Sequence, residues 1–303
     1  MTHALQLDLD DRSLPALPPT ASAMALNRTG RRRSGSLPGA GLSVGITFFW
    51  LSFIVLIPLS AVFAKSLSGG WDAFASAAFA PRTLASYRVT FGAALLAAAA
   101  NSVFGLLIAW VVVRYDFPLK RVFGALIDLP FALPTAVAGI ALTALYADSG
   151  LIGQQLSHVG WPVAYRPAGI VVALTFIGLP FVVRTVEPVL AEVSSEAEEA
   201  ALTLGASRLQ TFVRVILPTL LPALATGFTL AFARGAGEYG SVIFIAGNMP
   251  FKSEIAPLLV ITHLEQYDSQ GAAAIATVLL VVSFALLFLL NLLQHWQQRR
   301  LGA

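Results

Sequence analysis

The chain has 303 residues, of which 57% are hydrophobic and only 12% are charged, and its mean hydropathy is +0.77. A soluble domain carries about 25% charged residues, so this composition excludes a wholly water-soluble protein and predicts an integral membrane protein. The net charge of +3 is typical of basic cytoplasmic loops and does not indicate nucleic acid, and a sequence without cysteine excludes disulfides, thiolate metal sites and a cysteine nucleophile.

The first forty residues are rich in Pro, Ser and Ala and end near a run of arginines at 31–33. They lack the basic start and the apolar stretch of a cleaved signal peptide. We interpret residues 1–40 as a disordered cytoplasmic tail that precedes the membrane domain.

Six apolar runs are long enough to cross about 30 Å of hydrocarbon at about 1.5 Å per helical residue. They cover residues 41–64, 89–113, 122–147, 168–190, 217–247 and 271–293. None shows the alternating pattern of a membrane β-barrel strand, so the predicted fold class is all-α with six transmembrane helices. We assign them to one domain, 41–296, followed by a short cytoplasmic tail, 297–303.

The placement of Lys and Arg predicts the orientation, because cytoplasmic loops carry the excess of positive charge. In the six-span arrangement, one side holds Arg28, Arg31, Arg32, Arg33, Arg114, Lys120, Arg121, Arg208, Arg214, Arg299 and Arg300. The other side holds Lys65, Arg82, Arg88, Arg166 and Lys252. Both termini and the loop 191–217 are therefore predicted to be cytoplasmic.

Prolines interrupt the third and fourth predicted helices at Pro130, Pro134 and Pro180. Interrupted membrane helices can turn carbonyls or helix N-termini toward a water-filled path, although prolines and small residues also serve simple helix packing. We therefore take Pro130 and Pro134 as candidates for the lining of a translocation path, and keep helix packing as the alternative.

Charged residues within these helices cost several kcal/mol each unless they are paired or functional. Asp128 lies in the third run, and Arg184 lies three residues before Glu187 in the fourth, which is a spacing for a helical ion pair. Arg184 is thus either one half of a structural bridge or a second candidate for the path.

The loop 191–217 contains the signals of two short helices. Ser195 with Glu198, and Ser207 with Gln210, match the capping-box pattern, and Gly205 between them is placed to end the first helix in a left-handed conformation. The loop therefore predicts a helix–turn–helix on the cytoplasmic side.

The first of these helices has the character of a docking element. Ala200 and Ala201 give it a low-profile face, and Leu204 adds an apolar side chain one turn later. Three glutamates, at 196, 198 and 199, surround it, and an acidic surface favours a protein partner over anionic lipid. An ordinary amphipathic connector is the alternative.

The fifth run carries Arg234 and Glu238 at i,i+4 spacing, followed closely by Gly240. Arg234 lies sixteen residues beyond Pro218, or about 24 Å along a helix, which places it in the outer half of the bilayer. A guanidinium there can offer two parallel donors to an anion. Arg234, Glu238 and Gly240 are therefore further path candidates, with a structural Arg234–Glu238 bridge as the alternative.

The loop pattern resembles the EAA signature of membrane subunits of bacterial ABC importers: Glu-Ala-Ala, three residues, Gly, nine residues, an apolar pair and Leu-Pro. The matching positions are Glu199, Ala200, Ala201, Gly205, Leu217 and Pro218, with Val215 where the family usually places Ile. The resemblance implies a type I importer permease fold and a coupling helix that is seated in a cytoplasmic ATPase subunit.

Further segments, at 128–139, 180–186, 234–240 and 245–248, resemble the T subunit of sulfate/thiosulfate permeases. This likeness, from about residue 40 to residue 296, implies import of sulfate or thiosulfate. It also implies a heterodimer with a homologous W-type permease subunit, two copies of an ATP-binding subunit, and a periplasmic sulfate-binding protein that delivers the anion.

The chain lacks the Gly-x4-Gly-Lys-Ser/Thr phosphate loop, so ATP and magnesium are expected in the partner ATPase and no cofactor in this chain. Its four histidines are scattered without metal-ligand spacing or an apparent catalytic set, so we predict neither a metal site nor enzymatic activity.

Three alternatives stay open. Molybdate and tungstate permeases share the EAA loop and are the nearest confusable relatives. An ion-coupled secondary anion transporter would instead need its own coupling site near the midplane. A membrane-embedded enzyme would need a clustered catalytic set.

Overall fold

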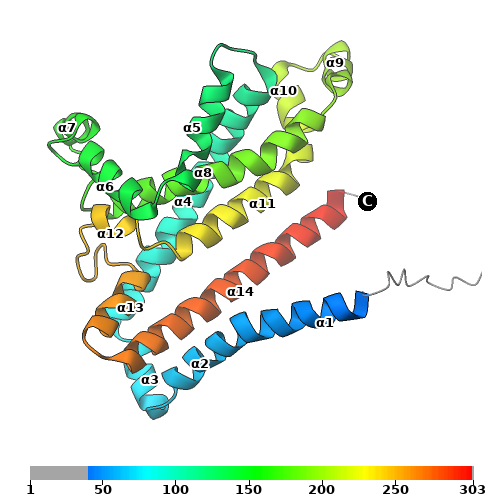
Figure 1. The fold of residues 1–303 in the computed structure, drawn as a ribbon. Helices are drawn as coiled ribbons and strands as arrows, with labels where there is room; N and C mark the ends of the chain where they lie inside the picture. Colours follow the sequence, from blue (N-terminus) through cyan, green and yellow to red (C-terminus); the bar gives the residue numbers. More distant parts are fainter. Residues whose placement is uncertain (1–39, 302–303) are drawn as a thin grey trace, which may run out of the picture. The chain divides into compact units, whose positions relative to one another are not determined.

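The computed structural model describes residues 40–301, which form helices and connecting loops without any strand in this range. The predicted all-α membrane fold is confirmed (Figure 1). The predicted N-terminal tail lies outside the described residues except for Ala40, where the first helix begins, and the last helix continues to Leu301.

Residues up to Leu56 and residues from Ile57 onward form two units. The first contains helix α1 (Ala40–Leu51) and the π-helical turn η1 (Ser52–Leu56). Its large apolar side chains are exposed all around the helix, including Leu42 (71%) and Phe48 (66%). A helix that is hydrophobic on every side is stable only when lipid or protein surrounds it.

Five helical stretches are long and apolar enough to cross a membrane: Gly41–Ser66, Pro81–Arg114, Pro167–Glu192, Arg208–Ala236 and Ser269–Leu292. The predicted third span has a different form. Helices α5 (Lys120–Ala132) and α6 (Thr135–Tyr146) pass the same test together, but they are bent by 114°. The predicted proline interruption of the third helix is therefore confirmed at Pro134, whereas Pro130 lies inside the continuous helix α5 and does not interrupt it.

The bend has a local cause at Leu133 and Pro134. Pro134 disfavours the helical conformation of the residue before it, and Leu133 is accordingly extended (φ −82°, ψ 135°). Pro134 then becomes the N-cap of α6. Pro180, in contrast, lies inside the continuous helix α8 (Pro167–Glu192), so the predicted interruption of the fourth helix was wrong.

The fifth predicted span, 217–247, was too long at its end. Helix α11 (Leu217–Ala236) stops at Gly237, and a loop then leads to the single turn α12 (Val242–Ile245). At its start, the span continues back through the π-helical turn η2 (Phe212–Ile216) into α10 (Arg208–Thr211). The turns η1 and η2 each end two residues before a proline, Pro58 and Pro218, which cannot donate the usual helical hydrogen bond.

The core of the second unit is the packing of α4 (Pro81–Arg114), α8 and α11 against one another (Figure 1). Helix α4 contributes buried alanines at 93, 94, 97, 98 and 109. Small residues also allow close approach elsewhere: a Cβ on Gly105 would lie 2.7 Å from Val182, and one on Gly227 would lie 2.8 Å from the Val182 backbone. Such contacts are typical of membrane helices, which associate through close fit.

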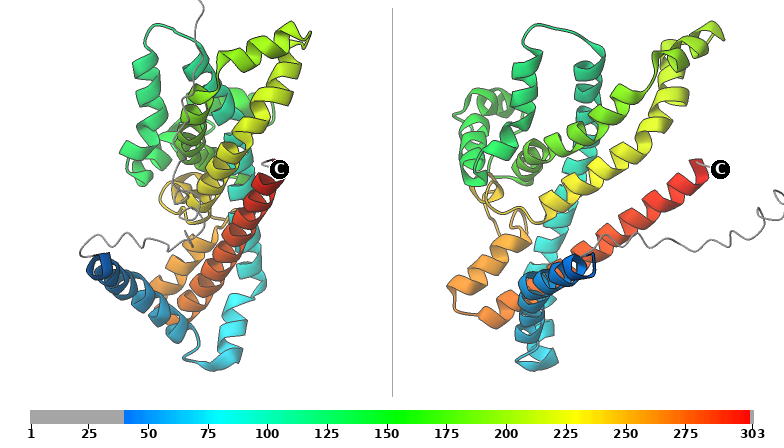
Figure 2. Two further views of the ribbon diagram at one scale, coloured as in Figure 1. Left: turned by 90° about the vertical axis from the view of Figure 1, so that its right-hand side faces the viewer. Right: turned by 45° about the vertical axis from the view of Figure 1, so that its right-hand side comes forward.

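A second group of helices packs beside α4. Helix α14 (Ser269–Leu301) contacts α13 (Ala256–Glu265), α2 (Ile57–Ser66) and α3 (Gly70–Ala78), and Figure 2 shows α13 and α14 as an antiparallel pair. The Tyr87 hydroxyl donates to the Ile275 carbonyl (3.2 Å), and the Ala256 N–H donates to Thr90 Oγ1 (2.8 Å). These bonds attach both helices to α4.

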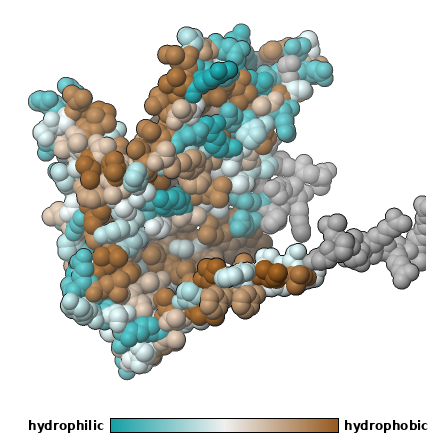
Figure 3. Space-filling model, in the orientation of Figure 1, coloured by the Kyte–Doolittle hydropathy of each residue, from teal (hydrophilic) through white to brown (hydrophobic). Residues whose placement is uncertain are grey.

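Hydrophobic residues cover much of the visible surface in Figure 3, whereas hydrophilic residues gather around the end occupied by α9 (Ser195–Thr203) and around α7 (Leu151–His158). These short helices lie at opposite ends of α8, since α9 follows its last residue and α7 precedes its first. The polar surfaces are therefore separated by the length of a membrane span.

We expect Gly227→Leu to destabilise the packing of α8 on α11, because the added side chain must displace the Val182 backbone. Overpacking of this kind costs about 1–3 kcal/mol. The midpoint of thermal unfolding in detergent should fall by several degrees. Gly92→Leu in α4 is the control, because a Cβ there meets nothing within 4 Å; equal losses in both variants would contradict the close-packing argument.

Candidate functional site

The loop between α8 and α11 forms the predicted helix–turn–helix. Gly205 ends α9 in the left-handed conformation (φ +85°), the Gly205 N–H donates to the Leu202 carbonyl, and the Ala206 N–H donates to the Ala201 carbonyl, each at 3.0 Å. This is the hydrogen-bond pattern of a Schellman motif. The prediction for Gly205 is confirmed.

The two predicted capping boxes have different outcomes. Ser207 and Gln210 form the second box, with both reciprocal bonds present. The first box was wrong: Ser194 is the N-cap of α9, Ser195 is its first helical residue, and Glu198 pairs with Arg114 instead. An ion pair with a distant arginine competes successfully with a local capping bond, because it is charge-assisted on both sides.

The exposed surface of α9 and α10 carries the signature residues. Glu199 and Ala200 are exposed, Ala201 is half-buried, and Leu217 and Pro218 are half-buried where α11 begins. Leu204 is 89% exposed, and Leu202 (47%) and Leu209 (72%) are exposed as well. Large apolar side chains on a polar loop, flanked by Glu196 and Glu199, indicate a docking surface for another protein.

This loop is fastened to the end of α4 by Arg114. The Arg114 guanidinium forms an ion pair with Glu198, approaches the Val193 carbonyl (3.5 Å), and lies 5.6 Å from the centre of the Trp110 ring. Trp110 packs edge-on against Phe212 at 5.3 Å. This cluster was not predicted, since 84 residues separate Arg114 from Glu198 and no local pattern connects them.

Arg184 lies at the centre of a second charged cluster. Its predicted pairing with Glu187 is present at 2.6 Å, and the guanidinium also forms a two-pronged ion pair with Asp128 of α5, with Nε 2.8 Å from Oδ1. Pro130 lies inside α5, two residues after Asp128. Two carboxylates against one arginine make this cluster net negative, which disfavours an anion beside Arg184.

Arg234 forms the predicted ion pair with Glu238 at the end of α11. The side chain of Glu238 is 2% exposed, and its Oε1 also accepts from the backbone N–H (3.0 Å) and the hydroxyl (3.1 Å) of Ser241. Arg234 is 36% exposed. Glu238 thus fixes the loop after α11, while part of the arginine stays accessible.

Gly240 and Pro134 are brought close together by tertiary packing. Gly240 lies against the side chain of Thr135, the residue that follows Pro134, and no room is left for a Cβ. Gly235 packs on Ala94 of α4 less tightly, because a Cβ there would make an ordinary contact at 3.5 Å. The close contact at Gly240 favours a packing role for that glycine.

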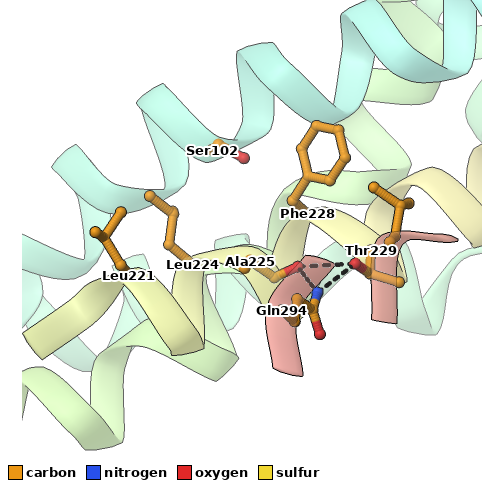
Figure 4. Close-up of a pocket in the computed structure, with 8 residues that line it drawn as sticks. Ser102, Leu221, Leu224, Ala225, Phe228, Thr229 and Gln294 are labelled. Atoms are coloured by element: carbon orange, nitrogen blue, oxygen red, sulfur yellow. Dashed lines mark hydrogen bonds between the residues drawn. The ribbon is translucent and has the colours of Figure 1, made fainter. Parts of the chain in front are cut away.

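A mostly apolar pocket of about 300 Å³ lies between α4, α11 and α14 (Figure 4). Ser102, Leu224 and Phe228 line it, and the Gln294 side-chain amide donates to the Ala225 carbonyl (2.8 Å) and to Thr229 Oγ1 (2.7 Å). These bonds hold α14 to α11 and satisfy a polar group at the end of an apolar helix.

At the opposite end of α4, Arg82 forms a bidentate ion pair with Glu254, at 2.6 and 2.8 Å. Glu254 precedes α13, and its side chain is 4% exposed. Between α13 and α14, the Gly271 N–H (2.8 Å) and the His263 ring (2.9 Å) hold the pKa of Asp268 below its usual range. Neither pair was predicted, because each depends on how the helices meet.

Comparison with known proteins identifies relatives along almost the whole chain. Residues 101–303 match the model of the binding-protein-dependent transport system inner membrane component family. The chain is 51% identical to the sulfate transport system permease protein CysT of Synechococcus elongatus over 84% of this chain and 92% of that protein. It is 46% identical to the Escherichia coli protein of the same name over 87% and 95%.

Among solved structures, a bacterial ABC transporter involved in alginate import has the same fold, with a TM-score of 0.68 over 85% of this chain and 94% of that one. The sequences are only 14% identical, so this likeness concerns the fold alone. The predicted type I permease fold is confirmed.

We expect Arg114→Ala to loosen α9 and α10 from α4 without unfolding the transmembrane core. Loss of a partly exposed ion pair costs on the order of 1 kcal/mol, which makes local opening about fivefold more frequent. Amide hydrogen exchange of residues 195–211 should accelerate accordingly. Arg121→Ala is the matched control, because Arg121 is exposed and forms no ion pair among the described side chains; unchanged exchange in the Arg114 variant would contradict the proposed anchor.

Proposed function

This chain belongs to the family of binding-protein-dependent transport system inner membrane components, and we propose that it supplies one membrane subunit of an ATP-driven importer of sulfate or thiosulfate. It is a multi-pass transmembrane permease. The observation that carries the substrate assignment is its 46–51% identity to permeases named for sulfate transport, over most of both chains.

The proposed complex contains a homologous W-type permease, two copies of an ATP-binding subunit and a periplasmic sulfate-binding protein. ATP and magnesium are bound by the ATP-binding subunits, and this chain contributes no catalytic residue and no metal site. We place the complex in the bacterial inner membrane with both termini in the cytoplasm, which the excess of Lys and Arg on that side supports.

Coupling begins at the surface of α9 and α10. Glu199, Ala200, Ala201 and Gly205 form the element that enters the ATPase subunit, and Leu204 adds an 89% exposed apolar contact. Displacement of this element acts on the membrane helices by two routes. One is the Arg114–Glu198 pair to α4, and the other is the continuous helical stretch Arg208–Ala236.

The second route connects the loop directly to the path candidates. Arg208–Ala236 contains 29 residues, or about 43 Å of helix, and Leu217 and Pro218 lie within it. Arg234 lies in its last turn, where a partly accessible guanidinium can attract a dianion. The pair with Glu238 weakens that attraction, and weak binding is needed for release.

The remaining path candidates contribute shape. Pro134 produces the bend of the third span, and Pro130 lies in the helix just before this bend. Gly240 lets the loop after α11 approach the bend. The Arg184 cluster, net negative and close to the cytoplasmic end of α8, repels an anion that has passed inward and so disfavours its return.

Growth of a sulfate-uptake-deficient strain tests the proposal. The complete complex should restore growth when sulfate or thiosulfate is limiting. Rescue with molybdate or tungstate alone would favour the alternative oxyanion permease. Counterflow of sulfate by the purified chain alone, without ATP, would favour an ion-coupled secondary transporter.

Gly205→Val should impair capture of the ATPase subunit, because a β-branched residue is strained in the left-handed conformation by at least about 1–2 kcal/mol. Strain of this size lowers the affinity for the ATPase subunit about tenfold. Space is not the problem, since a Cβ at Gly205 meets nothing within 4 Å. Gly205→Asn is the matched control, because Asn tolerates this conformation. Copurification of the ATPase measures the effect; wild-type yield with Val would refute the role of the turn.

Arg234→Ala should slow sulfate uptake several-fold in a complex that still assembles, because the accessible cation in the last turn of α11 is lost. Arg234→Lys keeps the charge and should retain much of the rate. Initial rates of radiolabelled sulfate uptake into proteoliposomes measure both variants. Unaltered transport by the Ala variant at normal expression would eliminate a contact between Arg234 and the anion.

A further inference from the structure

The end of the molecule opposite the coupling loop contains a polar cavity of about 470 Å³. Three segments line it: the turn after α6, the approach to α8, and the loop before α13. Its charged lining residues are Arg166, Lys252 and Asp148. We propose that this cavity is an entry site for a small inorganic dianion such as sulfate.

The charge balance of the cavity favours an anion. Two cations face one carboxylate, and neither cation forms an ion pair among the described side chains. Arg166 is also the N-cap of α8, a 26-residue helix whose first turn contains no acidic residue. The positive end of the helix dipole is therefore uncompensated and adds to the potential in the cavity.

Two other arginines toward this end differ from Arg166 and Lys252 because close carboxylates neutralise them. Arg82 is paired with Glu254, and Arg234 with Glu238. An anion that approaches this end therefore meets a net positive cavity beside neutral pairs. The low dielectric constant of protein walls concentrates such a field inside a cavity.

The walls of the cavity are held in fixed positions. The Tyr165 N–H donates to the Ile245 carbonyl at 2.7 Å, and Gly247 packs against the Tyr165 backbone. In the loop before α13, the Met249 carbonyl accepts three backbone N–H groups at 3.0–3.2 Å, and Ser253 Oγ accepts from the Met249 N–H. Glu254, paired with Arg82, secures this loop to α4.

Backbone strain accompanies this rigidity. Tyr165 and Phe251, which flank the two cations by one residue each, have positive φ values of 61° and 64°. Bulky residues rarely adopt this conformation, and it persists where the surroundings enforce it, commonly at functional sites. The two cations are therefore presented from segments whose backbone is already ordered.

The site is built for weak, hydrated binding. Arg166 and Lys252 are exposed, and the cavity is larger than a bare tetrahedral oxyanion, so water remains around the ligand. Weak binding suits a first contact from which the anion moves onward. The inference rests on the proposed function for the identity of the anion, while the test below does not require transport.

The lack of native cysteine in this chain allows a direct test in the complete complex. Met249→Cys places one thiol in the lining of the cavity, and Tyr267→Cys, at a residue 95% exposed in the α13–α14 turn, is the control. An anionic and a cationic methanethiosulfonate reagent are compared at low ionic strength, with modification of this chain read by mass spectrometry.

We expect the ratio of the anionic to the cationic reaction rate to be about 5–10-fold higher at the cavity thiol than at the control thiol. An electrostatic potential of about one kT predicts a difference of this size between reagents of opposite charge. Sulfate should slow the anionic reaction more than chloride at matched ionic strength. Both effects should disappear with Arg166→Gln and Lys252→Gln together, and should persist with the charge-preserving pair Arg166→Lys and Lys252→Arg.

Equal reactivity at both thiols, or equal protection by sulfate and chloride, would overturn the site. A third outcome would also overturn the anion site: binding protein without anion slows modification of the cavity thiol, while sulfate alone does not. That result would assign this surface to protein docking. If protection by sulfate is present but the wild-type complex takes up no sulfate, the proposed function fails while the anion site stands.

Discussion

Close packing inside lipid is the constraint on which this structure depends. Apolar side chains gain no hydrophobic free energy by moving from lipid to a neighbouring helix, so helices associate where their surfaces fit closely or where polar groups meet. Helix α8 satisfies this condition with two partners: Gly105 of α4 and Gly227 of α11 both pack against Val182. The three helices thereby form one core, and every functional segment of the second unit is attached to it.

Helix α4 connects the two polar ends of this core. Its 34 residues extend about 51 Å, more than the hydrocarbon thickness of about 30 Å, so both ends reach polar surroundings. Arg82 at one end secures the loop before α13, and Arg114 at the other secures the coupling helix. The surface proposed to meet the ATPase and the cavity proposed for the anion are thus attached to the same rigid helix.

Several features could be predicted from sequence because they are determined locally. Gly205 and the Ser207–Gln210 box were found correctly, since a left-handed terminator and a capping box require residues only a few positions apart. The pairs Arg184–Glu187 and Arg234–Glu238 were also found, because they follow helical spacing. Glu198 was misassigned because a suitable local partner was present in the sequence while a stronger one, Arg114, came from another helix.

The sequence by itself determined that the chain is a membrane protein. It also determined the number of apolar runs, the position of the polar helix–turn–helix loop and the family that this loop resembles. These properties depend on hydrophobic length, local turns and short motifs, which are encoded in neighbouring residues. Tertiary structure decided the 114° bend of the third span, the early end of α11, the partners of Arg82, Arg114 and Asp128, and the cavity beside Arg166 and Lys252. The ion-pair partners and the cavity join segments that are far apart in the chain. Proline disfavours a helical residue before it at all three positions, but only Pro134 ends a helix while Pro130 and Pro180 stay inside one, and the surroundings decide between these outcomes.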